Sequence, residues 1–95
     1  MYDYRTEAPQ ILREFLAYHE TIKGHSQRTV DEYFLDLRNF FRFLKQRRDP
    51  SLADRALDEI SIADVDLAFV KSVALTDVYE YMSYLSRDRV QHLNS

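Results

Sequence analysis

The sequence contains one glycine and two prolines among its 95 residues. Tight hairpin turns draw on glycine and on Asn-Gly or Asp-Gly pairs, whereas helix interiors exclude glycine and proline. This scarcity predicts an all-α chain. An apolar fraction of 45% is sufficient to form the core of one small domain, which we expect to span residues 1–95.

Two helices are predicted in the first half of the chain. Apolar residues at helical spacing between Ile11 and Ile22 follow Pro9, which suits a first turn, and precede Gly24, which suits a C-terminal cap. Ser26 or Thr29 then caps a second helix that ends near Arg48, before Pro50. Its apolar stripe has a spacing of three and four and consists of Val30, Phe34, Leu37, Phe41 and Leu44, with Tyr33 and Phe40 at its edges.

The second half of the chain has weaker helical signals. Residues 49–59 are predicted to be an acidic connector with a short helical turn at most. Ser61 and Asp64 form a capping box for a third helix through Val73, and Thr76 caps a fourth whose buried stripe is expected to be Val78, Tyr81, Met82 and Leu85. Residues 87–95 carry little apolar content and are expected to fray. The elements together predict a small four-helix bundle.

Positive charge is concentrated on one segment of an acidic chain. The formal net charge is -3, yet residues 23–48 carry seven Lys or Arg and three acids. The electrostatic potential felt by a ligand depends mainly on charges within a Debye length of about 10 Å. This segment is therefore able to attract phosphate although the whole chain is acidic. At 100° per residue, Arg38, Arg42 and Lys45 are predicted to form an outward ridge beside the apolar stripe.

Several classes of function lack support in the residues. The absence of cysteine excludes disulfides and thiolate metal sites, no apolar run approaches a membrane span, and the N-terminus lacks the regions of a signal peptide. We therefore expect a soluble intracellular protein without cofactor or metal. His25 and Arg28 match an H-x-x-R pattern, but they precede a helix cap and have no second catalytic cluster, so we predict no enzymatic activity for the chain itself.

The order of these features resembles the N-terminal core-binding domain of tyrosine recombinases, the phage integrases and Xer-like enzymes. The residues that carry the resemblance are F-L-x-Y (Phe15, Leu16, Tyr18), I-K-G-H-S-Q-R-T from Ile22 to Thr29, Y-x-x-D-L-x-x-F from Tyr33 to Phe40, I-S-I-A-D-V from Ile60 to Val65, and L-T-D-V-Y-E-Y-M-S-Y-L from Leu75 to Leu85. The resemblance implies a SAM-like helical bundle, here without the final helix of the full domain. It also implies a longer cytoplasmic integrase of bacterial or phage origin, associated with the nucleoid.

For function, the resemblance implies one half of a clamp around a recombination site in double-stranded DNA. The catalytic domain would be a separate part of the same polypeptide, and other recombinase protomers would join the assembly on DNA. The positions that the family implies as DNA contacts lie at the start and on the polar face of the second helix, and here they are Lys23, Ser26, Gln27, Arg28, Thr29, Arg38 and Arg42, with Lys45 as a further contact.

Two other interpretations remain open. In the first, Ser26 and Thr29 only cap the helix while Arg38 and Arg42 balance Asp31 and Asp36. In the second, the chain is a helical protein-interaction module, in which Phe43 and Leu35, both predicted to lie off the core stripe, meet a partner.

Overall fold

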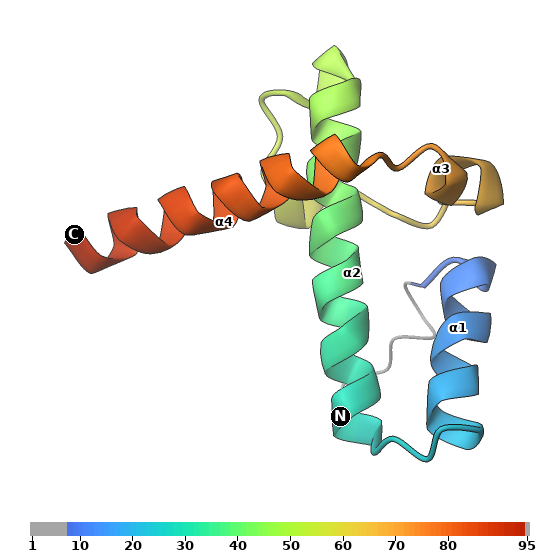
Figure 1. Cartoon of the computed structure of the whole chain (residues 1–95). Coiled ribbons are helices and arrows are strands. Elements are labelled where there is room, and N and C mark those ends of the chain that lie inside the picture. Colours follow the sequence, from blue (N-terminus) through green and yellow to red (C-terminus); the bar gives the residue numbers. More distant parts are fainter. Residues whose placement is uncertain (1–7, 95) are drawn as a thin grey trace.

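The computed structural model describes the backbone of residues 8–94 and the side chains of residues 8–87. Within that range the regular structure is helical: α1 (Gln10–Thr21), α2 (Gln27–Arg48), two 3₁₀ turns, η2 (Pro50–Leu52) and η3 (Leu57–Glu59), then α3 (Leu67–Lys71) and α4 (Leu75–Asn94). The all-α prediction is confirmed. Figure 1 shows α2 as the central axis, with α1 beside its first half and α4 crossing its second half.

The ends of α1 and α2 follow the predicted signals. Pro9 is the N-cap of α1, and Gly24 adopts φ 70° in the connection that follows the helix. Ser26 is the N-cap of α2, and Asp49 ends the helix directly before Pro50. Because a side chain at positive φ is strained, glycine suits the left-handed residue that lets the chain reverse between the two helices.

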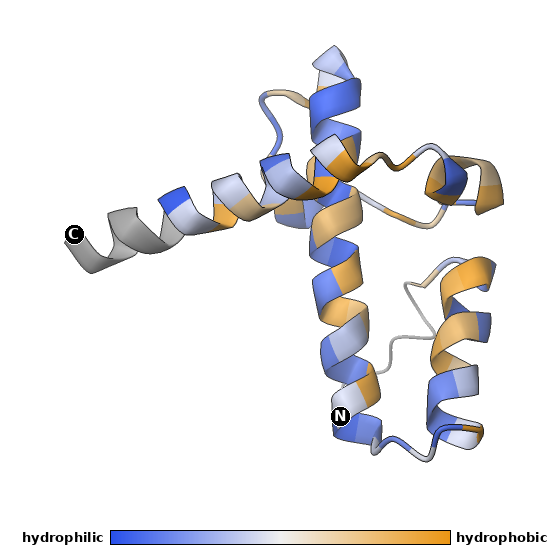
Figure 2. Ribbon diagram, viewed as in Figure 1, coloured by the Kyte–Doolittle hydropathy of each residue, from blue (hydrophilic) through white to orange (hydrophobic). Residues whose placement is uncertain are grey.

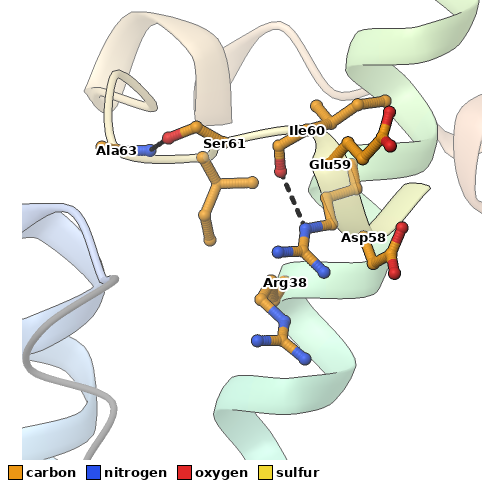
Figure 3. Close-up of a pocket in the computed structure, with 8 residues that line it drawn as sticks. Arg38, Asp58, Glu59, Ile60, Ser61 and Ala63 are labelled. Atoms are coloured by element: carbon orange, nitrogen blue, oxygen red, sulfur yellow. Dashed lines mark hydrogen bonds between the residues drawn. The ribbon is translucent and has the colours of Figure 1, made fainter. Parts of the chain in front are cut away.

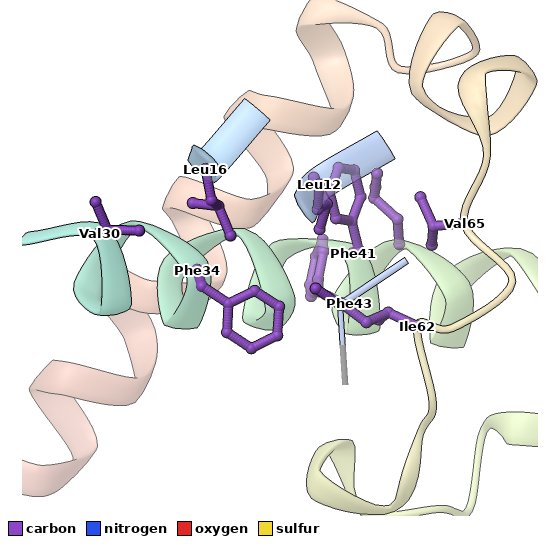
Figure 4. Close-up of a cluster of buried hydrophobic side chains, with 10 residues drawn as sticks. Leu12, Leu16, Val30, Phe34, Phe41, Phe43, Ile62 and Val65 are labelled. Carbon is purple, nitrogen blue, oxygen red and sulfur yellow. The ribbon is translucent and has the colours of Figure 1, made fainter. Parts of the chain in front are cut away.

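The core forms where α1 and the segment after η3 meet α2. Leu16, Val30, Phe34 and Leu44 are almost fully buried. Around them pack Ala8, Leu12, Phe41, Phe43, Ile62 and Val65 (Figure 4). The stripe predicted for α2 contributes Val30, Phe34, Phe41 and Leu44 to this core, and Figure 2 shows the apolar side of α2 turned toward α1.

Phe43 differs from the prediction that it lies off the core. Only 3% of its surface is exposed, because α4 crosses α2 at this point and places Tyr81 and Tyr84 over the ring, with centroids 5.2 and 5.1 Å away. Leu35 is also partly buried against the core. Both residues therefore pack within the domain, and neither forms the exposed surface that the protein-interaction hypothesis requires.

The third helix is shorter than predicted. It begins at Leu67, where the Asp66 carboxylate accepts a hydrogen bond from the Phe69 amide, and not at the predicted Ser61 and Asp64 box. Ser61 instead accepts a hydrogen bond from the Ala63 amide in a local turn. Residues 60–65 stay irregular because Ile60, Ile62 and Val65 all turn into the core, a spacing that a helix does not allow on one narrow face.

Helix α4 also departs from the prediction. It begins at Leu75, one residue before the predicted cap Thr76, and its backbone is helical through Asn94, where a frayed tail was expected from residue 87. It packs through Tyr81 and Tyr84, whereas most of the predicted stripe faces solvent. Five large apolar residues of α4 are exposed, and we call them the α4 stripe: Leu75, Val78, Tyr79, Met82 and Leu85.

Candidate nucleic-acid interface

The start of α2 is a hydrogen-bonded helix end. The Ser26 hydroxyl oxygen accepts a bond from the Thr29 amide at 3.2 Å and donates one to the Thr29 hydroxyl at 3.0 Å. Gln27 donates its side-chain amide to Asp31 at 2.8 Å. The first amides of a helix have no partner within the helix, so those of Gln27 and Arg28 point out of its end. The first turn contains no acidic residue, which makes this end suitable for an anion.

Two cations flank that helix end. Lys23 is exposed, and 90% of the Arg28 side chain is accessible. Arg28 lies 3.4 Å from the Glu32 carboxylate, whose side chain is itself 62% exposed. An exposed ion pair of this kind contributes less than about 1 kcal/mol, so Glu32 does not prevent Arg28 from meeting a phosphate. Four predicted site residues, Ser26, Gln27, Arg28 and Thr29, thus lie at the N-terminal end of α2, and Lys23 lies in the connection that precedes it.

The three cations predicted to share a flank of α2 do face the same segment, residues 58–64. Arg38 and Arg42 line a recess of about 290 Å³ with residues 58–63 (Figure 3). Arg38 is half-buried, and its guanidinium carbon lies 5.8 Å from the centroid of the Phe34 ring. Its place on the wall of an open recess keeps Arg38 compatible with a contact to a bound polyanion.

Arg42 does not project outward as predicted. Its exposed fraction is 8%, and its Nε donates a hydrogen bond of 2.8 Å to the Ile60 carbonyl. The segment after η3 passes over α2 here, and a buried carbonyl requires a donor. Arg42 therefore joins this segment to α2, and its outward orientation is a prediction that we correct.

Lys45 is held by the same segment. Its ammonium donates to the Ser61 carbonyl at 2.7 Å and pairs with the Asp64 carboxylate, and only 18% of its side chain is exposed. The hydrogen bond from Lys45 lowers the pKa of the Asp64 carboxyl below its ordinary value. Burial opposes this shift in part, and the positive charge of Lys45 adds a further small lowering. The predicted ridge of three outward cations thus reduces to Arg38.

Arg47 and Arg48, which the sequence left without a role, hold the second half of the chain. Arg47 pairs with Glu80 at 3.0 Å. Arg48 pairs with Asp77 at 3.3 Å, donates to the Ser72 hydroxyl at 2.6 Å, and lies over the Phe69 ring. Acids three residues apart on the fourth helix were the only available signal, and they could not be assigned to Arg47 and Arg48 without knowing how the helices cross.

Of the two residues of the H-x-x-R pattern, His25 packs between the helices and Arg28 does not. His25 stacks on His19, whereas Arg28 is exposed and pairs with Glu32. In the part of the chain that the structure describes, no group of three His, Cys, Asp or Glu side chains is arranged to hold a metal ion. No helix of that part is long and apolar enough to cross a membrane.

Comparison with known proteins gives two matches. The model of the family described as phage integrase, N-terminal SAM-like domain, matches residues 12–78. Tyrosine recombinase XerC of Caldanaerobacter subterraneus subsp. tengcongensis is 47% identical over 81 residues, which cover 85% of this chain and 23% of that recombinase. No solved structure matches the chain significantly.

Proposed function

The chain belongs to the phage integrase N-terminal SAM-like domain family, and we propose that it binds duplex DNA as part of a site-specific tyrosine recombinase. In this proposal it grips the recombination site and positions a separate catalytic domain, which carries out the bond cleavage and rejoining. The chain spans about a quarter of the length of the recombinase that it matches. The catalytic domain and further recombinase protomers are therefore its proposed protein partners.

The observation that carries the proposal is the positive end of α2. The exposed residues Lys23, Ser26 and Arg28 lie close together in the chain at the start of α2, with the first-turn amides and the Thr29 hydroxyl, and the first turn contains no acid. Backbone amides and hydroxyls bind phosphate oxygens at short range, and Lys or Arg add attraction at longer range. We propose that this end contacts the DNA backbone through Lys23, Ser26, Gln27, Arg28 and Thr29.

The flank of α2 contributes in two different ways. Arg38 stands at the recess and is proposed to contact DNA directly. Arg42 and Lys45 are proposed to act indirectly, since their hydrogen bonds fix residues 60–64 against α2 beside Arg38. Acidic side chains at Asp58 and Glu59 border the same recess and would repel a phosphate that approached from the connector side.

A titration of the 95-residue chain with short duplex DNA tests the proposal. Affinity should fall steeply as salt rises, because phosphate contacts release counterions. Replacing Arg38 with Ala should weaken binding, whereas Arg55→Ala, in the exposed connector, should leave it unchanged. Equal affinities for the two variants would remove the flank of α2 from the interface. Binding without salt dependence would contradict an electrostatic grip on the backbone.

The α4 stripe supports an additional role in protein contact. Tyr79 and Met82 are about 60% exposed, on a helix that extends away from the rest of the domain in Figure 1. Grouped exposed apolar residues mark interaction surfaces. We propose that this stripe meets the catalytic domain of the recombinase polypeptide.

The alternative function is a module that binds only other proteins, and the DNA titration also tests it. Amide chemical shifts recorded during the DNA titration distinguish the two functions. Changes at residues 23–29 and at Arg38 support DNA binding. Changes confined to α3 and α4, or an absence of changes at low salt, favour the interaction module.

A further inference from the structure

A group of rings joins the end of α1 to the beginning of α2. The His19 ring, in the last turn of α1, stacks on the His25 ring with centroids 5.4 Å apart and planes at 25°. Tyr33, in the second turn of α2, meets both rings edge-on at 5.6 and 5.7 Å. Phe15 contacts His19 from the other side at 4.5 Å. We refer to His19, His25 and Tyr33 as the corner stack.

The backbone of the connection is fixed only as far as His25. The Ile22 amide donates to the Tyr18 carbonyl at 2.8 Å, and the His25 amide donates to the His19 carbonyl at 3.1 Å. Gly24, at φ 70°, provides the reversal between them. These bonds end α1, but none of them reaches α2, which starts with Ser26 as its N-cap. The direction in which α2 leaves the corner therefore depends on side chains.

Besides the core contacts between α1 and α2, His25 is a side chain placed to set that direction. It directly precedes Ser26, and its ring touches one helix through His19 and the other through Tyr33. Stacked and edge-to-face ring pairs have preferred geometries, so a ring held from two sides orients the backbone that carries it. The Ser26 hydroxyl and the outward amides of the first turn lie one to three residues further along.

We propose that His25 is a positioning residue for the phosphate-binding end of α2. This inference rests on the proposed function, because it assigns to the corner stack the task of presenting Ser26, Thr29 and the first-turn amides to a DNA backbone. His25 acts through its planar ring and not through its charge or its nitrogen atoms. Loss of the planar ring should therefore lower DNA affinity by about five- to tenfold, the lower end of the range expected for the loss of its two ring pairs with His19 and Tyr33.

Three variants of the 95-residue chain test the role of the ring. His25→Phe retains a planar ring, His25→Leu retains apolar volume without a ring, and His25→Ala removes both. Each is titrated with short duplex DNA in low salt, and each is first shown by circular dichroism to be helical and to unfold cooperatively. The prediction is that His25→Phe binds within about twofold of the parent, whereas His25→Leu and His25→Ala lose about five- to tenfold. If only one of these two folds, that variant alone is compared with His25→Phe.

Two results would overturn the proposal. Equal losses in the Phe and Leu variants would show that the imidazole itself contacts DNA, and parent-like affinity in the Leu variant would show that the ring has no positioning role. A second measurement separates this inference from the proposed function. Without DNA, the amide shifts and hydrogen exchange of Ser26, Gln27, Arg28 and Thr29 should match the parent in His25→Phe and differ in His25→Leu. If the first turn of α2 changes in His25→Leu but the parent chain does not bind DNA, the proposed DNA-binding function is refuted and the positioning role of His25 is retained.

Discussion

The two halves of α2 use the same kinds of side chain for different purposes. In residues 27–38 the packing is one-sided, with Val30 and Phe34 turned toward α1, and Arg28 reaches into solvent. In residues 39–48 four consecutive residues, Phe41, Arg42, Phe43 and Leu44, are buried. A helix covered all round has no outward ridge.

The difference between the halves shows that a cation on a helix has no fixed role until its neighbours are known. In the second half Arg42 and Lys45 hold the segment after η3, and Arg47 and Arg48 hold the beginning of α4. In the first half the exposed Arg28 pairs with Glu32, a carboxylate that is itself exposed. We therefore expect substitutions in the second half to affect stability and those in the first half to affect DNA binding.

The largest effect is expected for Phe43→Ala. Removing a buried phenylalanine costs about 3–5 kcal/mol, and here it also removes the ring contacts that hold Tyr81 and Tyr84. Chemical denaturation should show the loss of stability, and the tyrosine ring resonances of α4 should shift toward exposed values. Tyr79→Ala, on the exposed side of α4, is the control and should change stability by less than about 0.5 kcal/mol. Similar losses in both variants would mean that α4 is not fastened through Phe43.

A smaller loss is expected for Arg42→Ala. The variant leaves the Ile60 carbonyl without its donor, which costs about 1–3 kcal/mol. Arg42→Lys should also destabilise, because an ammonium does not reproduce the Nε hydrogen bond. Thermal unfolding provides the measurement, with Arg55→Ala as the control. If Arg42→Ala is as stable as the control, the hydrogen bond from Arg42 to Ile60 does not stabilise the fold.

The third prediction contrasts two pairs of cations. Replacing Lys23 and Arg28 with Ala should weaken duplex binding about tenfold and reduce the slope of log affinity against log salt by about two, since two phosphate contacts are lost. Stability should change by less than about 0.5 kcal/mol. The matched pair is Arg47→Ala with Arg48→Ala, which should lower stability and leave the salt slope unchanged. The comparison between the halves fails if the second pair changes the slope as much as the first.

The smallest effect concerns Asp64 at low pH. Its folded-state pKa is lowered by Lys45, so the pair stabilises the fold above the unfolded pKa of about 3.9, and that contribution is lost as the pH falls through the folded pKa. Because Asp64 is largely exposed, the contribution should be below about 1 kcal/mol. Asp64→Asn should therefore be less stable than the parent at neutral pH and converge with it in denaturation curves as the pH falls through the lowered folded-state pKa of Asp64. A constant difference across this range would show that Asp64 acts without its charge.

Much of the fold could be predicted because its signals are local. The caps Pro9 and Ser26, the reversal at Gly24 and the end of α2 before Pro50 depend on residues within one or two turns. The stripe through Val30, Phe34, Phe41 and Leu44 follows from helix periodicity alone. The predicted helix end with Ser26, Arg28 and Thr29 belongs to the same class, because one turn of backbone brings these residues together.

The sequence by itself therefore determined where the first two helices begin and end, which face of α2 is buried, and which end of α2 begins with exposed cations. Only the tertiary structure decided that Phe43 is buried, that Arg42 and Lys45 bind residues 60–64, and that α4 packs through Tyr81 and Tyr84. The physical reason is distance along the chain. Arg42 and Ile60 are 18 residues apart, and their contact depends on how separate elements cross, which no local periodicity encodes.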